Sequence, residues 1–180
     1  MRLRPRLLSI AILATVSVVS VVTGPAQASG PTRYIFTPGH NPLSSLKHLA
    51  ATSPSTQSSH ADAWDVKVAG VDQNGVPLYR ISHTSVLGVK CLDLEASNLN
   101  AGTRLTSAVC REFSPSSTQN WRLVPTQVDG KATVKLRNSS SGLVAGVRDA
   151  SVANGAVVEL QVDNDQKHQK FYQSTVWLGD

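Results

Sequence analysis

The chain has 180 residues, of which 41% are hydrophobic and 16% are charged, and its formal net charge is +5. Three of its 17 Lys and Arg residues lie within the first six positions, so the remainder carries 14 basic against 12 acidic residues. No run of Lys and Arg marks a phosphate-binding surface, and we therefore expect no nucleic-acid partner.

The first 28 residues have the pattern of an export signal. Three arginines precede an apolar run over 7–22, and an A-x-A cleavage site ends at Ala28. An uncleaved membrane anchor is the alternative, but the Ser and Thr content of the run and the cleavage site favour removal. No later segment is apolar for long enough to span a bilayer. We expect a secreted protein, cut after Ala28, whose residues 29–180 form one domain with a core and have no membrane partner.

Strand and turn patterns dominate from residue 33 onward. RYIFT from Arg33 predicts an opening strand, and SSLKHLAA around Leu46 predicts one or two helical turns. Asn74-Gly75 and Asp129-Gly130 each separate two runs of branched residues, which is the strongest short-range indication of a β-hairpin. No segment has a sustained apolar period of 3.6 residues between caps. The predicted fold class is therefore all-β.

Cys91 and Cys110 are the two cysteines of the chain, with 18 residues between them. In an oxidising compartment two such cysteines are paired more often than free. A metal site would need C-x-x-C spacing or a histidine pair at ligand spacing beside them, and neither is present. We predict a structural disulfide, no metal site and no cofactor.

The chain also contains internal repeats. The segment that begins at Leu78 can be laid beside the one that begins at Val134, so that Cys91 matches Val144, 53 residues further on. A Q-x-W ending at Trp121 then matches a Q-x-F ending, and a more degenerate copy precedes both. Each copy alone exposes an apolar face, so the copies must pack on one another.

The pattern G-x-K-C-L-D-L, N-A-G-T-x-L, a second cysteine and Q-N-W resembles one repeat of the ricin-type β-trefoil lectins, the Q-x-W family. The match is carried by Gly88, Cys91, Leu92, Asp93, Asn100, Gly102, Cys110, Gln119 and Trp121. It is specific in residues 79–124 and looser in 133–173 and 33–68. The resemblance implies a β-trefoil, with repeats at about 33–78, 79–132 and 133–180 around a pseudo-threefold axis. It places Trp64, Trp121 and Phe171 in the common core, and a cysteine pair within a repeat is a feature of the same family.

For function, the resemblance implies the binding of galactose-type sugars or polysaccharides in shallow pockets. Such a pocket needs a carboxylate that accepts hydrogen bonds from two adjacent hydroxyls, a ring that stacks on the sugar, and an amide. Asp93 stands at the carboxylate position, and Gln119, with Asn120 beside it, supplies the amide. These three residues form the predicted carbohydrate site.

The same repeat departs from the family at the aromatic residue. That ring usually lies two residues before the second cysteine, where this chain has Ala108. Phe113 would replace the ring only if its loop, EFSPSS, folds back. The site predicted at Asp93 is therefore incomplete.

The other two copies depart further from the pattern. In the later copy Gly146 stands at the carboxylate position and Gln161 at the aromatic position, and Asp149 is out of register by three residues. The corresponding stretch of the first copy, around Ala50 and Ala51, contains no carboxylate. At most one site of the usual kind is predicted.

No pattern in the sequence indicates catalysis. There is no H-E-x-x-H and no G-x-S-x-G, and the five histidines are scattered. The leading hypothesis is a secreted, non-enzymatic module that binds carbohydrate at Asp93. Because a fold does not determine a function, the alternative is a trefoil used for protein interaction, such as an inhibitor or accessory subunit. The loss of the stacking rings favours that alternative.

Overall fold

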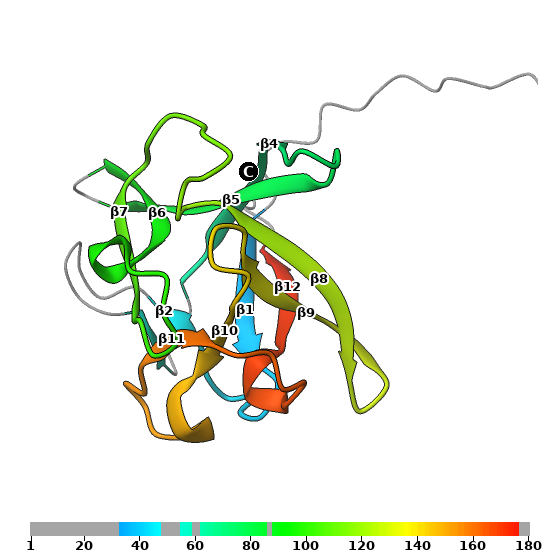
Figure 1. Cartoon of the computed structure of the whole chain (residues 1–180). Helices are drawn as coiled ribbons and strands as arrows, with labels where there is room; N and C mark the ends of the chain where they lie inside the picture. Colours follow the sequence, from blue (N-terminus) through cyan, green and yellow to red (C-terminus); the bar gives the residue numbers. More distant parts are fainter. Residues whose placement is uncertain (1–32, 48–54, 59–61, 86–87, 177–180) are drawn as a thin grey trace, which may run out of the picture.

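A computed structural model of the chain describes residues 33–47, 55–58, 62–85 and 88–176 (Figure 1). Within these ranges the regular structure consists of strands and short 3-10 helices, so the predicted all-β class is confirmed. The expected export signal, residues 1–28, lies outside the described residues. The elements are β1 (Arg33–Pro38), β2 (Ser45–Lys47), β3 (Thr56–Ser58), β4 (Trp64–Val71), β5 (Pro77–Ser85), β6 (Gly88–Leu94), η1 (Glu95–Ser97), β7 (Leu105–Val109), β8 (Trp121–Val128), β9 (Lys131–Asn138), β10 (Val144–Val147), η2 (Arg148–Ala150), β11 (Val158–Gln161), η3 (Lys167–Gln169) and β12 (Phe171–Val176).

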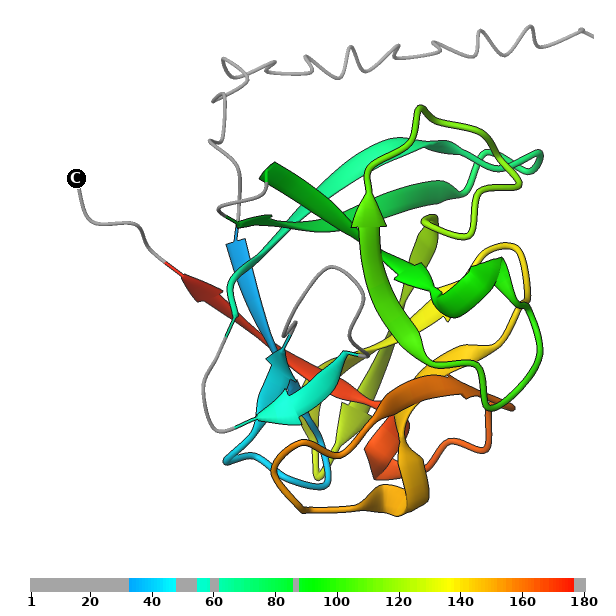
Figure 2. The ribbon, with the colours of Figure 1, turned by 90° about the vertical axis from the view of Figure 1, so that its left-hand side faces the viewer.

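Six of the described strands form a closed ring. β1 pairs with β12 and β4, β5 pairs with β4 and β8, and β9 pairs with β8 and β12, all antiparallel. Figures 1 and 2 show β1 and β12 side by side in the wall of this barrel. Three further hairpins, β2–β3, β6–β7 and β10–β11, complete the fold. Closing the ring removes the open sheet edges that invite aggregation.

The strand register reveals a threefold repeat of four strands each: β1–β4, β5–β8 and β9–β12. In each set the aromatic residue that opens the last strand pairs with an equivalent residue of the first strand. The pairs are Tyr34 with Trp64, Tyr79 with Trp121, and Val134 with Phe171. The three copies therefore share one register, although their sequences differ.

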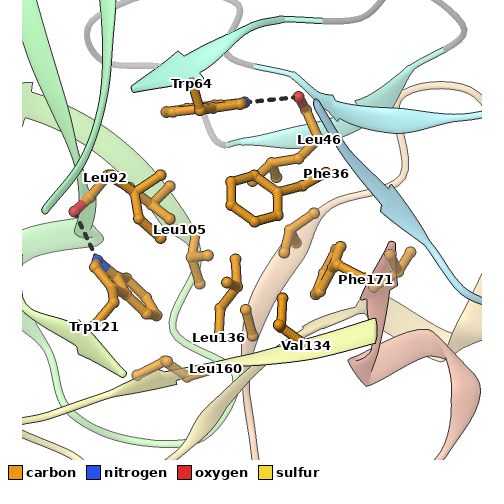
Figure 3. Packing of buried hydrophobic residues seen from close by; sticks show 14 of the residues in the cluster. Phe36, Leu46, Trp64, Leu92, Leu105, Trp121, Val134, Leu136, Leu160 and Phe171 are labelled. Atoms are coloured by element: carbon orange, nitrogen blue, oxygen red, sulfur yellow. Dashed lines mark hydrogen bonds between the residues drawn. The ribbon is translucent and has the colours of Figure 1, made fainter. Parts of the chain in front are cut away.

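The aromatic residues of the three repeats meet in one core. Trp64, Trp121 and Phe171 are all fully buried in the same hydrophobic cluster (Figure 3). The indole Nε1 of Trp64 donates to the carbonyl of Leu46 at 3.1 Å, and that of Trp121 donates to the carbonyl of Leu92 at 3.1 Å. Because a buried indole N–H needs a partner, these bonds fix the first and second hairpins against the barrel.

The helical turns predicted around Leu46 are wrong in the part of that segment that the structure describes. Ser45–Lys47 is a β-strand, paired with β3. The side chain of Leu46 is fully buried, and its carbonyl accepts the bond from Trp64. Tertiary packing has thus overridden a weak local preference for helix. The rest of the segment, from residue 48 to 51, lies outside the described residues.

Both predicted hairpins are present. In the β8–β9 turn, Val128 pairs with Lys131, and both central residues have positive φ, 49° for Asp129 and 75° for Gly130. Positive φ at both central positions is the requirement of a two-residue type I′ turn. The β4–β5 turn is longer, and Gly75 has a φ of 76°.

Candidate functional site

The hairpin register identifies the counterparts of Asp93 and Ala108 in the other repeats. Asp93 pairs with Thr106, as Lys47 pairs with Thr56 and Gly146 with Glu159. The three residues at the carboxylate position are thus Lys47, Asp93 and Gly146, and those at the aromatic position are Ser58, Ala108 and Gln161. Ala50 and Ala51, which we expected at the first of these positions, lie outside the described residues, and Lys47 holds that position instead.

Asp93 is 4% exposed and accepts hydrogen bonds from four groups of the protein. The hydroxyl of Thr118 and the backbone N–H of Leu94 donate to Oδ1, at 2.5 and 2.8 Å. The amide of Gln119 and Nη2 of Arg111 donate to Oδ2, at 3.0 and 2.7 Å. A carboxylate has about four lone-pair positions, so these donors occupy the capacity of Asp93.

The two predicted amide residues are likewise fully buried and bonded within the protein. Oε1 of Gln119 accepts from the backbone N–H of Arg111 at 2.9 Å and from Nη1 of Arg80 at 3.0 Å. Oδ1 of Asn120 accepts from Nε of Arg80 at 3.0 Å, and its Nδ2 donates to the carbonyl of Ser114 at 2.6 Å. The structure brings Gln119 into contact with Asp93, whereas Asn120 supports the loop that follows Cys110.

Two arginines that the sequence did not single out organise this site. Arg80, on β5, donates to the carbonyls of Arg111 and Glu112, at 2.7 and 3.1 Å. Burial, and secondarily the charge of Arg111, lower the pKa of Arg80. The disulfide between Cys91 and Cys110 holds the start of the same loop against β6. Arg111 follows Cys110 directly, so the disulfide and Arg80 together determine where its guanidinium lies.

A solvent-open depression of about 500 Å³ lies beside Asp93. Its lining includes Asp93, Ala108 and Arg111, and it contains no aromatic ring. The Arg111 side chain is 49% exposed, and its Nη2 is bonded to Asp93 and to Thr118. A guanidinium has five N–H donors, so three are not used by these bonds. The group that this depression presents to a ligand is therefore the guanidinium of Arg111, a hydrogen-bond donor, rather than the carboxylate of Asp93.

Phe113 does not supply the missing ring. A Cβ placed on Gly70 would lie 2.4 to 2.8 Å from atoms of the Phe113 ring, so this ring packs closely on the β4–β5 hairpin. It is not part of the lining of the depression beside Asp93. The loop 112–117 has folded onto a neighbouring hairpin, where glycine leaves room for the ring.

The corresponding place in the third repeat is filled by its own side chains. A Cβ on Gly146 would lie 2.1 Å from Oε1 of Gln161, so the glutamine occupies the space of the missing carboxylate. This oxygen accepts from His168 Nε2 and Gln169 Nε2, both at 3.1 Å. Burial is the main cause that lowers the pKa of His168. Asp149, which we expected to be out of register, does line the depression of about 430 Å³ beside Gln161.

Across the residues that the structure describes, no three His, Cys, Asp or Glu side chains gather in a way that would hold a metal ion. No helix in those same ranges is both long and apolar enough to cross a bilayer.

No known family model and no curated protein matches the chain. Among solved structures, the fold is similar to the designed threefold-symmetric protein ThreeFoil, with 22% identity and a TM-score of 0.61, over 78% of this chain and 96% of that one. An exo-β-1,3-galactanase from Clostridium thermocellum has 17% identity and a TM-score of 0.67, over 82% of this chain and 31% of its own. The Rhizoctonia solani agglutinin has 14% identity and a TM-score of 0.57, over 82% of this chain and 96% of its own.

These likenesses define the class of the fold. The protein is an all-β β-trefoil, as the sequence resemblance implied, and its structural neighbours also include a lectin from Polyporus squamosus. The chain spans about a third of the galactanase, so the resemblance covers only one part of that enzyme.

Proposed function

We propose that the protein is a secreted, non-enzymatic carbohydrate-binding module of the lectin type, released by cleavage after Ala28. The main observation in support is the open depression in the second repeat, whose lining includes Asp93 and Arg111, with Gln119 bonded to Asp93 behind it. Polar groups that converge in a surface depression are typical of sugar sites. The β-trefoil fold that the chain shares with an agglutinin is consistent with this class.

In this proposal Arg111, rather than Asp93, makes the contact with the sugar. Asp93 holds Nη2 of Arg111 at 2.7 Å, which leaves the outer N–H groups of the guanidinium to donate to hydroxyl oxygens of the ligand. Gln119 fixes the carboxylate from behind, at 3.0 Å, and Asn120 supports the loop. The predicted residues Asp93, Gln119 and Asn120 then position the arginine.

The absence of a stacking ring sets the expected strength of binding. Ala108 lines the depression where a ring would supply the apolar contact. Most of the affinity must then come from hydrogen bonds between protein and sugar, and their net gain is small because they replace hydrogen bonds to water. We expect a dissociation constant on the order of 1 mM for a single sugar unit, which corresponds to about 4 kcal/mol. Polysaccharides that present many units would bind more strongly through avidity.

Binding of residues 29–180 to a glycan array and to insoluble polysaccharides tests the proposal. The probes include galactose, lactose and β-1,3-galactan, because a galactanase is among the structural neighbours. We expect Arg111→Ala to weaken binding at least tenfold, and Arg104→Ala, which removes an exposed arginine outside this lining, to leave it unchanged. Wild-type protein that retains no glycan would show that the proposed function is wrong.

A second candidate function is protein interaction, as an inhibitor or accessory subunit. It is favoured by the exposed apolar side chains of Val68, Val71 and Val76 on the β4–β5 hairpin, beside the exposed Phe113. It is also favoured because four donors of the protein occupy the Asp93 carboxylate and because Gln161 fills the space at Gly146. Capture of a partner protein that survives excess galactose and lactose, but is lost when Phe113 is changed to Ser, would support this candidate.

A further inference from the structure

We infer that a second saccharide site lies between β1, β12 and the β8–β9 turn, and that it binds a sugar unit through two adjacent hydroxyls. This inference rests on the proposed function but uses a different surface. The depression there has a volume of about 770 Å³. Figure 1 shows the β8–β9 turn and η3 near the same end of β1 and β12. The residues that carry the inference are His40, Asp129, Lys131, Lys167 and Tyr172.

Tyr172 supplies the aromatic ring that the depression beside Asp93 lacks. It lies on β12 opposite Thr37 of β1, and both residues line the depression. Its neighbour Phe171 is fully buried in the core, so alternation along the strand turns Tyr172 toward the outer side of the barrel. The tyrosine is only half-buried. A partly exposed ring in a depression is the usual platform for the apolar face of a sugar.

Asp129 supplies a carboxylate that is open to a ligand. Its side chain is 70% exposed, and Nζ of Lys167 donates to both of its oxygens at 2.8 Å. Those bonds use two of about four lone-pair positions, and two remain for adjacent hydroxyls. Asp93 is the opposite case, because it is 4% exposed and four donors of the protein occupy the lone-pair positions of its carboxylate. The free carboxylate acceptor that was expected at Asp93 is therefore found at Asp129.

The charged groups around the depression offer both acceptors and donors to sugar hydroxyls. Asp129 neutralises Lys167, and Lys131 adds one further ammonium donor from the start of β9. Hydroxyls of a ligand can donate to Asp129 and accept from Lys131.

His40 contributes its ring to the same lining. Its Nε2 lies 3.0 Å from the carbonyl of Ser151, which can only accept, so in the neutral ring Nε2 carries the proton. This bond fixes the position of the ring. Nδ1 is buried and is not offered to a ligand.

The floor of the depression is held firmly by backbone packing. A Cβ on Gly39 would lie 2.9 Å from Cγ2 of Val128, and 3.0 and 3.2 Å from the carbonyls of Lys167 and Lys170. The N–H of Gly39 donates to the carbonyl of Lys170 at 2.7 Å. Close packing of this kind joins the end of β1 to η3, so the lining residues are preorganised for a ligand.

NMR titration of ¹⁵N-labelled protein with galactose, lactose and β-1,3-galactan oligosaccharides tests the inference. We expect ligand-dependent shifts at the amides of Gly39, Lys131 and Tyr172. Tyr172→Ala should weaken binding at this surface at least tenfold, and Tyr172→Phe, which keeps the ring, should preserve it.

Asp129→Asn provides a second variant that is compatible with folding. Asparagine tolerates the positive φ of this turn, so the substitution removes the negative charge and keeps the backbone. We expect at least a tenfold loss of binding at this surface, and Asp165→Asn, at another exposed aspartate with positive φ, is the matched control.

Shifts around Arg111 without shifts at Gly39 or Lys131 would overturn this inference and leave the proposed function intact. An absence of shifts at both surfaces would overturn both, and shifts at Gly39 that Asp129→Asn and Tyr172→Ala leave unchanged would overturn the residue assignment.

Discussion

Asp163 occupies in the third repeat the place that Cys110 occupies in the second. Each lies two residues beyond the aromatic position of its hairpin. Cys110 is joined to Cys91 by a disulfide, whereas the carboxylate of Asp163 accepts from Nζ of Lys135 at 2.7 Å and from Nη2 of Arg137 at 2.6 Å. The same loop of two repeats is thus tied by a disulfide to β6 in one and by ion pairs to β9 in the other.

Removal of the disulfide should lower the stability of the domain substantially. For a loop with 18 residues between its cysteines, the chain-entropy model gives a loss of about 3 kcal/mol in the free energy of unfolding. Urea denaturation of the Cys91→Ala, Cys110→Ala variant measures this loss. An unchanged midpoint would mean that the contacts of Arg80 alone hold the loop.

Removal of the ion pairs should have a smaller effect that depends on pH. Burial raises the pKa of Asp163, but the hydrogen bond from Lys135 and other interactions outweigh it, so the pKa lies below the ordinary value of 3.8. A depressed carboxyl pKa stabilises the fold above the unfolded pKa, and this contribution is lost as the pH falls through the folded pKa. Asp163→Asn should cost about 1 kcal/mol at pH 7, because the group is partly exposed.

Urea denaturation of the wild type and of Asp163→Asn at pH 7 and at pH 3 measures this contribution. The difference in the free energy of unfolding between the two proteins should be smaller at the lower pH. An equal difference at both values would show that the carboxylate charge does not matter and that only packing was changed.

His83 should make the domain less stable as the pH falls below neutrality. It is buried, with its ring 5.1 Å from that of Trp64, and burial is the largest cause that lowers its pKa. The unfolded chain then binds protons more readily than the folded one, so stability decreases as the pH falls through the unfolded value of about 6.5. In urea denaturation at several pH values, His83→Gln should reduce the slope of the free energy of unfolding against pH between pH 7 and pH 5. A slope that stays the same in the variant would refute this assignment.

The indole of Trp121 should contribute a hydrogen bond that phenylalanine cannot replace. Trp121→Phe keeps an aromatic ring in the core but leaves the buried carbonyl of Leu92 without its donor. An unsatisfied buried acceptor costs about 1 to 3 kcal/mol. Thermal and urea denaturation measure the loss. The matched comparison is Trp64→Phe, which removes the equivalent bond from the Trp64 indole to the carbonyl of Leu46 and should cause a loss of similar size.

The fold was largely predictable because its determinants are local and repeated. Asp129-Gly130 specifies its turn through backbone φ alone, and Trp121 and Phe171 end their repeats with the same pattern. The first repeat was harder to place. Lys47, and not Ala50 or Ala51, is the counterpart of Asp93, and only the pairing of β2 with β3 reveals this register.

The chemistry of the site was less predictable, because it depends on where long side chains reach. The sequence placed Gln119 near Asp93, and the structure brings the two into contact. It gave no indication that Arg111 would bond to Asp93, or that Arg80 would hold the loop, because both contacts depend on the path of the loop after Cys110. Tyr172 and Asp129 are likewise separated by 43 positions, and only the closure of the barrel places them in the lining of one depression.

In the proposed site, Asp93 acts through Arg111 and does not itself contact the saccharide. Calorimetric titration of the wild type, Arg111→Ala, Asp93→Asn and the double variant, with the tightest-binding glycan of the array, distinguishes the two roles. We expect Arg111→Ala to weaken binding at least tenfold and Asp93→Asn to have no further effect in that background. Tighter binding by Arg111→Ala, abolished by the added Asp93→Asn, would refute this assignment, because it would show that the freed carboxylate contacts the sugar.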